Sequence, residues 1–303
     1  MRKKIVVTGA SGMVGTGLLG LIRDAPAYEV LGVYKDNQPA ITGENISYLQ
    51  ADLTQGEGWQ RLDDMQMYAL VHCAAKIPKT FGVNESKDAY MVNSRMDSLA
   101  LSCAISKNAK LVYISSSSVY GDSSKGICKE DSRLNPINAY AKGKSESESK
   151  ILDNKSIFKY FILRLSSPYG PHQRNNTVLK LFTENALRGE PLIYHGEGQR
   201  MQDFIYVKDI ARAMAMALES ENSGVYNVTS GSSICMKDLA HLIKDITGSK
   251  SEVKPSGTKD MQEKYRPLFD ISKAARLLNW QPLYPLEKGL AEFIEYLSGD
   301  RKS

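Results

Sequence analysis

Short apolar runs alternate with amphipathic stretches along the first half of the chain. The runs cover residues 5–7, 30–34, 69–73, 111–115 and 160–165, and β-branched side chains are frequent in them. Such runs are typical of strands buried on both faces of a parallel sheet. The stretches between them show helical spacing. This alternation predicts an α/β fold with a doubly wound parallel sheet, and ligands at the carboxyl ends of its strands.

A glycine-rich turn directly follows the first predicted strand. The segment Thr8-Gly9-Ala10-Ser11-Gly12-Met13-Val14-Gly15 joins that strand to the first predicted helix. Gly9 permits a tight turn, Gly12 lets the backbone approach a phosphate, and Gly15 allows the helix to pack closely on the strand. Backbone N–H groups and the helix dipole at such a junction hold a pyrophosphate. We therefore expect a dinucleotide cofactor to contact Gly9, Ser11, Gly12, Met13, Val14 and Gly15.

The pattern changes after Leu165. Residues 166–171 break the alternation, and the remainder mixes short segments with predicted helices over 236–247 and 286–297. We expect residues 1–165 to form a dinucleotide-binding domain and residues 166–303 to form a smaller, interleaved substrate-binding lobe.

Three residues predict a proton-transfer site. Tyr140 and Lys144 are four positions apart and share one face of a predicted helix, while Ser116 ends a predicted strand. An ammonium beside a phenol favours the anion, so Lys144 is expected to lower the pKa of Tyr140. Tyr140 then transfers the proton and Ser116 hydrogen-bonds the reacting oxygen. Gly143 within the same helix indicates close backbone packing beside the cofactor.

Composition narrows the range of partners. The chain has 303 residues, of which 42% are hydrophobic and 24% charged, and no apolar run is long enough to span a membrane. The net charge of +5 is dispersed, without the basic stripe that nucleic-acid binding requires. The 4 cysteines and 4 histidines lack metal-ligand spacing, and scattered cysteines favour reduced thiols. We expect a cytoplasmic protein with no metal, nucleic-acid or membrane partner, in which His72 packs against a backbone partner.

The motifs together resemble the extended short-chain dehydrogenase/reductase family, in particular its NAD(P)-dependent sugar-nucleotide epimerases, dehydratases and reductases. The resemblance covers nearly the whole chain, because further landmarks match in Ala51-Asp52-Leu53, His72-Cys73-Ala74-Ala75, Val92-Asn93 and Asp203-Phe204-Ile205-Tyr206-Val207. It implies a Rossmann-like fold, the return of residues 203–228 to the first domain, and a homodimer. It also implies cofactor contacts from Asp52, Leu53, Ala74, Ala75 and Asn93, and from the catalytic Tyr140 and Lys144.

The resemblance also bears on the reaction. Dehydratases of the family carry an Asp-Glu pair directly after the catalytic Ser or Thr, whereas Ser117 and Ser118 occupy these positions here. Hydroxyl groups do not act as acid and base for water elimination at neutral pH, which disfavours dehydration. We favour epimerisation at C4 of a nucleoside-diphosphate sugar through a transient 4-keto intermediate. The alternative is an NADPH-dependent 4-keto-sugar-nucleotide reductase. A non-catalytic NAD(P)-binding sensor fits the intact motifs less well.

Substrate contacts are expected from the second half of the chain and from Ser117. Asn176 resembles a diphosphate-contacting position of the 4-epimerases, and Arg266 resembles a phosphate-binding arginine. Ser167 stands where many relatives have Asn, and Gln202 stands where many have Arg, so Arg200 is the candidate to replace that arginine. The nucleotide and the sugar stay open.

The choice of cofactor depends on the end of the second predicted strand. NAD-dependent relatives place an acidic residue there, whereas this chain reads Tyr34-Lys35-Asp36. Lys35 suits the 2′-phosphate of NADP, and Asp36 suits the ribose of NAD. We favour NAD and leave NADP open, with Asp52 expected to contact adenine in either case.

Overall fold

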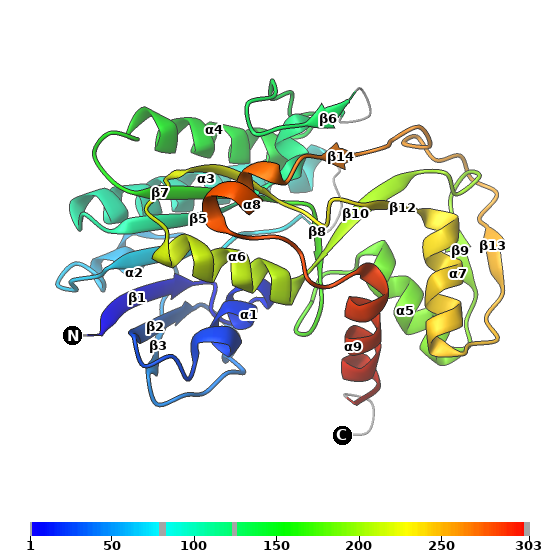
Figure 1. The fold of residues 1–303 in the computed structure, drawn as a ribbon, viewed down its shortest axis with the longest axis horizontal. Coiled ribbons are helices and arrows are strands. Elements are labelled where there is room, and N and C mark those ends of the chain that lie inside the picture. The colour runs from blue at the N-terminus through cyan, green and yellow to red at the C-terminus, as the bar shows by residue number, and fades with distance from the viewer. Residues whose placement is uncertain (1, 79–82, 123–125, 300–303) are drawn as a thin grey trace.

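Seven parallel strands form the central sheet (Figure 1). The computed structural model describes residues 2–78, 83–122 and 126–299. The strand order is β11-β7-β5-β4-β1-β2-β3. The strands are β1 (Lys3–Thr8), β2 (Tyr28–Tyr34), β3 (Ile46–Gln50), β4 (Ala69–His72), β5 (Lys110–Ser116), β7 (Tyr160–Leu165) and β11 (Gly224–Val228). The predicted α/β fold with a parallel, Rossmann-like sheet is confirmed.

Helices cover both faces of this sheet, as Figure 1 shows. One face packs against α1 (Met13–Ile22), α6 (Val207–Glu219) and α8 (Ser272–Leu278). The other face packs against α2 (Gly56–Gln60), α3 (Val83–Ser106) and α4 (Ala139–Asp153). Side chains alternate along β1, because Ile5 and Val7 enter the first core and Val6 enters the second. Burial on both faces explains why the strands read as continuous apolar runs.

The rest of the chain builds a second group of elements around its own core. It comprises β8 (Ser167–Tyr169), β10 (Met201–Tyr206) and β12 (Ser233–Cys235) in one small sheet, with helices α5 (Val178–Arg188), α7 (Met236–Thr247) and α9 (Leu286–Gly299). Two further strand pairs are β9 (Leu192–Tyr194) with β13 (Val253–Pro255), and β6 (Ile127–Cys128) with β14 (Leu268–Phe269). The helix predicted over 236–247 is confirmed, and the one predicted over 286–297 continues to Gly299.

Two late segments lie against the first part of the chain. Helix α6 packs on the sheet face that α1 covers, and β11 pairs in parallel with β7, with Val225 opposite Ile162. The division of the chain at Leu165 stays a prediction. Among the described residues, no helix is long and apolar enough to cross a membrane.

Candidate active site

The turn after β1 and the segment after β4 pack directly on each other. Gly9 has φ +67°, and a Cβ atom added to it would lie 2.7 Å from the backbone nitrogen of Ala74. The same nitrogen donates to the Thr8 hydroxyl at 3.2 Å. Only glycine fits this position without strain or collision. The tight turn predicted at Gly9 is therefore present. It packs against the segment of Ala74, so two segments that are predicted to bind the cofactor are in contact.

Helix α1 begins immediately after this turn. Its N-cap residue is Gly12, which makes no side-chain capping bond, so the first N–H groups of α1 lack a side-chain acceptor. A Cβ atom on Gly15 would lie 2.3 Å from the carbonyl oxygen of Gly9. Gly15 thus lets α1 pack on the turn rather than on the strand that we expected. Met13 and Val14 pack their side chains against the two neighbouring cores, and Ser11 is half-buried.

Asn93 holds the segment that follows β4. Its side-chain oxygen accepts from the backbone nitrogen of Lys76 at 2.7 Å, and its side-chain nitrogen donates to the carbonyl oxygen of Lys76 at 2.9 Å. The residue is only 3% exposed. Both of its polar groups therefore fix the backbone next to Ala74 and Ala75, which we predicted to contact the cofactor.

Lys35 and Asp52 form an ion pair beyond the ends of β2 and β3. The Lys35 Nζ lies 3.0 Å from Asp52 Oδ2, and the Asp52 carboxylate also accepts from the backbone and hydroxyl of Thr54. Burial opposes ionisation of Asp52, but these bonds outweigh it and lower the pKa of the carboxyl. The side chain of Leu53 packs in the core, so a ligand could contact this residue only through its backbone.

The three predicted catalytic residues lie on two adjoining elements. Ser116 ends β5, and its hydroxyl lies 2.8 Å from the Ser118 hydroxyl. Asn138 caps α4 by accepting from the Ala141 backbone nitrogen at 2.8 Å, which starts the helix just before Tyr140. The Lys144 Nζ donates to the carbonyl oxygen of Ile114 at 3.0 Å. This bond fastens α4 to β5 close to Ser116.

The charge environment of Tyr140 differs from our expectation. Burial raises the pKa of Tyr140, and the carboxylate of Asp97 raises it further. Lys144, predicted to lower this pKa, has its Nζ 3.7 Å from Asp97 Oδ2. Burial and the carboxylate of Asp97 thus keep the pKa of Tyr140 above its ordinary value in the chain without a cofactor, and a lowering by Lys144 together with an oxidised nicotinamide stays a prediction.

The structure also bears on the expectations for His72 and Gly143, and it corrects the first. His72 is fully buried, but its partners are side chains rather than backbone: Nδ1 lies 2.8 Å from the Thr8 hydroxyl and Nε2 lies 3.1 Å from Asp97 Oδ1. At Gly143, an added Cβ atom would lie 3.0 Å from the Tyr90 ring of α3. Gly143 therefore lets α4 pack closely on α3, and its proximity to the cofactor stays a prediction.

The predicted substrate contacts lie on a different set of segments. The backbone nitrogen of Met201 donates to the carbonyl oxygen of Tyr265 at 3.0 Å, which brings the segments of Arg200 and Arg266 together. The Arg200 Nε lies 3.2 Å from Asp260 Oδ2. Arg266 donates to two backbone carbonyls, and among the described residues no carboxylate lies within ion-pair distance of it.

Ser167 and Gln202, the two residues that differ from those of many relatives, contact each other. The Gln202 side-chain nitrogen donates to the Ser167 hydroxyl, between β10 and β8. Ser117 opens the short 3₁₀ turn η1 (Ser117–Tyr120) after Ser116. Asn176 is exposed, just before the Thr177 cap of α5. The structure thus groups Arg200 with Arg266, and Ser167 with Gln202.

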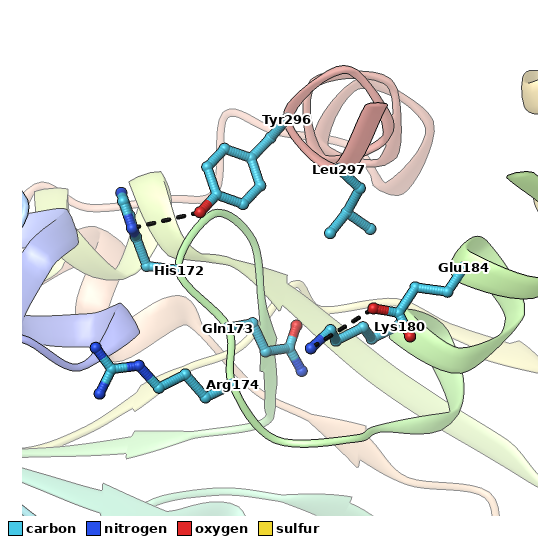
Figure 2. Close-up of a pocket in the computed structure, with 7 residues that line it drawn as sticks. All are labelled: His172, Gln173, Arg174, Lys180, Glu184, Tyr296 and Leu297. Atoms are coloured by element: carbon cyan, nitrogen blue, oxygen red, sulfur yellow. Dashed lines mark hydrogen bonds and ion pairs between the residues drawn. The ribbon is translucent and has the colours of Figure 1, made fainter. Parts of the chain in front are cut away.

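Sequence reasoning missed a pocket of about 440 Å³ between the segment after β8, α5 and α9. Figure 2 shows Gln173 and Lys180 pointing into this space, with Leu297 on the opposite wall. Lys180 pairs with Glu184 at 3.7 Å, and the Tyr296 hydroxyl lies 3.5 Å from His172 Nδ1. None of the residues predicted to bind cofactor or substrate lines it.

Sequence reasoning also missed the polar residues behind Lys144. Asp97, Tyr113 and Ser147 are each at most 5% exposed. The only sequence signal was the position of Asp97, four residues after Asn93 and therefore on the same face of α3.

Comparisons with known proteins place the chain among nucleotide-sugar enzymes. The family model described as the NAD dependent epimerase/dehydratase family matches residues 5–229. The UDP-glucuronic acid decarboxylase 1 of Danio rerio is 29% identical over 98% of this chain and 73% of its own length. The dTDP-D-glucose 4,6-dehydratase of Mus musculus is 25% identical over 97% of this chain and 88% of its own. A solved structure of a UDP-glucose 4-epimerase from Thermotoga maritima with UDP-glucose superimposes on this chain with a TM-score of 0.88. The two sequences are 26% identical, and the match covers 98% of this chain and 99% of that one.

Proposed function

Because the chain belongs to the NAD dependent epimerase/dehydratase family, we propose that it epimerises a nucleoside-diphosphate sugar at C4 through a transient 4-keto intermediate. The observation that carries the proposal is the combination of Tyr140 and Lys144 on α4 with Ser116 followed by Ser117 and Ser118. This set can move a proton to and from a sugar hydroxyl, yet it lacks the carboxyl pair that water elimination requires.

The glycine turn fits the dinucleotide of this family. A Cβ atom at Gly9 would collide with the backbone of Ala74, so glycine at this position lets the turn lie directly against the segment after β4. The N–H groups at the start of α1 have no side-chain cap at Gly12. Uncapped N–H groups and the positive end of the helix dipole bind a pyrophosphate well. Gly9, Ser11, Gly12 and Met13 would hold it through their backbone.

When bound, NAD supplies a hydride acceptor, which becomes the donor in the return step, and a positive charge in its oxidised form. Tyr140 takes the proton of the C4 hydroxyl and gives it back when the carbonyl is reduced. Ser116 donates to the same oxygen, and Ser118 holds the Ser116 hydroxyl in place at 2.8 Å. Lys144 is fixed by its bond to the Ile114 carbonyl, so its charge stays beside α4 and β5.

The diphosphate of the substrate is the proposed ligand of the arginine segments. Arg266 has the stronger case, because no described carboxylate pairs with it, whereas Asp260 already balances Arg200. Ser117, Ser167 and Asn176 are proposed contacts for the sugar and the diphosphate. We further propose that residues 166–303 supply most of the substrate contacts and that the protein acts as a homodimer.

Two assays test this proposal. Denaturing the purified protein should release NAD, identified by chromatography against NAD and NADP standards. The holoenzyme should then interconvert two epimers from a panel of UDP-, GDP- and dTDP-sugars without net change in NADH. Consumption of NADPH by a 4-keto sugar nucleotide would support the reductase instead, and loss of water from the sugar would overturn the assignment in favour of a dehydratase.

A further inference from the structure

A buried carboxylate lies behind the proposed catalytic pair. Asp97, in the middle of α3, has a side chain that is 2% exposed. Its Oδ2 atom accepts from the Tyr113 hydroxyl of β5 at 2.5 Å and from the Ser147 hydroxyl of α4 at 2.9 Å, and lies 3.7 Å from the Lys144 Nζ. Its Oδ1 atom lies 3.1 Å from His72 Nε2. Groups from β4, β5 and α4 thus converge on one carboxylate.

The network continues to the cofactor turn. His72 Nδ1 lies 2.8 Å from the Thr8 hydroxyl, and the Thr8 oxygen accepts from the backbone nitrogen of Ala74 at 3.2 Å. A neutral imidazole with its proton on Nε2 satisfies both contacts, since it accepts from Thr8 and donates to Asp97. The side chains of Thr8, His72 and Asp97 are therefore linked in one path from the glycine turn to Lys144.

Among the titratable groups that face Asp97 and Tyr140, two carry a charge: the Asp97 carboxylate and the Lys144 ammonium. Burial raises the pKa of Cys73, next to β4, to about 12, and raises the pKa of Tyr113 well above its ordinary value, so both stay neutral. Burial also opposes the charge of Asp97, but Lys144, His72 and Tyr113 outweigh it and lower the pKa of Asp97 to about 2. Asp97 is therefore an anion throughout the physiological range, paired with the Lys144 cation.

The position of Lys144 follows from this carboxylate together with two other contacts. Its Nζ donates to the Ile114 carbonyl at 3.0 Å and lies 4.5 Å from the centroid of the Tyr113 ring. Tyr113 itself is oriented by its bond to Asp97. Removing the carboxylate would leave the ammonium with its bond to the Ile114 carbonyl, but without its counter-charge and without the bond that orients the Tyr113 ring.

We propose that Asp97 is a positioning residue that fixes the Lys144 ammonium and sets, through its negative charge, the pH at which Tyr140 releases its proton. This rests on the proposed function in that Tyr140 is the proton-transfer group. Asp97 acts against the lysine: it offsets the positive charge that favours the phenolate. It thereby raises the pH at which the phenolate that accepts the C4 proton forms, and it favours the phenol produced in that step until the proton returns to the 4-keto oxygen.

The variant Asp97→Asn removes the charge and retains the size of the side chain. The acidic limb of the profile of kcat/KM against pH should move to lower pH by about one unit, because a nearby negative charge no longer favours the protonated phenol. The variant Ser147→Ala is the matched control, since it deletes one hydrogen bond to the same carboxylate and keeps both charges. The acidic limb of the pH profile of this control should stay in place.

Asp97→Ser is also uncharged, and it repeats the test if the amide of Asp97→Asn disturbs folding. A uniform loss of kcat/KM with an unmoved limb would overturn the proposal.

A second readout does not depend on turnover. With NAD⁺ bound, the phenolate absorbance of Tyr140 is obtained as the difference between the wild type and Tyr140→Phe during a pH titration. The same difference taken in the Asp97→Asn background should show the phenolate at lower pH. An identical or higher midpoint would overturn the role of Asp97, even if no sugar nucleotide proved to be a substrate. Absence of turnover with a shifted phenolate would instead reject only the proposed function.

Discussion

The region around Tyr140 and the region around Arg266 are built in opposite ways. Lys144 and Asp97 are at most 3% exposed in their side chains, and their partners come from strands and helices of the main sheet. Arg266 lies on an irregular segment and bonds to the carbonyls of Glu263 and Tyr265, its near neighbours in sequence. Rigid elements preserve the geometry that proton transfer requires, whereas a loop held by local bonds can adapt to different sugars.

The largest expected effect in this comparison is that of Tyr140→Phe. Loss of the phenol should lower kcat/KM by about 10²- to 10⁴-fold, the usual share of a general acid–base group. Steady-state kinetics and a NAD binding titration measure the two effects, and NAD affinity should be nearly unchanged. The control is Tyr90→Phe, which removes a hydroxyl bonded to Glu146 between α3 and α4. If Tyr140→Phe turned over substrate as fast as this control, Tyr140 would not be the group that transfers the proton.

A second contrast concerns stability. Arg164 and Glu148 form an ion pair at 2.6 Å with side chains 3% and 1% exposed. Glu148→Gln should cost about 3–5 kcal/mol in the free energy of unfolding, because it leaves a buried guanidinium uncompensated. Glu252→Gln, which breaks an exposed pair with Lys254, should cost at most about 1 kcal/mol. Urea denaturation measures both, and equal losses would remove this difference between the regions.

The loop region should respond in substrate affinity. Arg266→Gln is expected to raise KM by about 10- to 100-fold, the loss of one or two charge-assisted hydrogen bonds, with little change in kcat. Arg200→Gln should raise KM less, because Asp260 already balances that guanidinium. Initial-rate kinetics against the nucleotide sugar separate these parameters. A fall in kcat at constant KM would place Arg266 in the chemical step.

The smallest expected effect appears in acid. The pKa of Asp97 is lowered from 3.8 to about 2, so its charge stabilises the folded chain above pH 3.8 and this contribution is lost as pH falls toward 2. Between these limits the wild type should lose about 2 kcal/mol more stability than Asp97→Asn. Denaturant unfolding at several pH values measures the difference. Parallel curves for the two proteins would show that the carboxylate is no more stabilised in the folded chain than in the unfolded one.

The sequence predicted local features well. The apolar run at 160–165 and the helix at 236–247 have the bounds seen in the structure, because burial on both sheet faces and an amphipathic period are properties of contiguous residues. The spacing of Tyr140 and Lys144 likewise placed both on one helix. Strand β3, with polar Ser47 and Gln50, carried no comparable signal.

Contacts between distant segments could not be predicted. Asp97 reads as an ordinary helix carboxylate until β5 and α4 cover it, and only the packed structure brings Tyr113 and Lys144 to it. The bond between Gln202 and Ser167 depends on the register of β10 and β8, which neither segment specifies alone. For this reason the proposed proton-transfer residues could be named from the sequence, while the carboxylate that opposes the charge of Lys144 could not.

The central claim is C4 epimerisation by hydride removal and return, and the most direct measurement is proton NMR of the holoenzyme in D₂O with a panel of UDP-, GDP- and dTDP-sugars. The account predicts that a sugar of this panel converts to its C4 epimer with protium retained at C4 and no accumulation of NADH. Deuterium entering the sugar together with loss of water, or an unchanged sugar in every case, would contradict it.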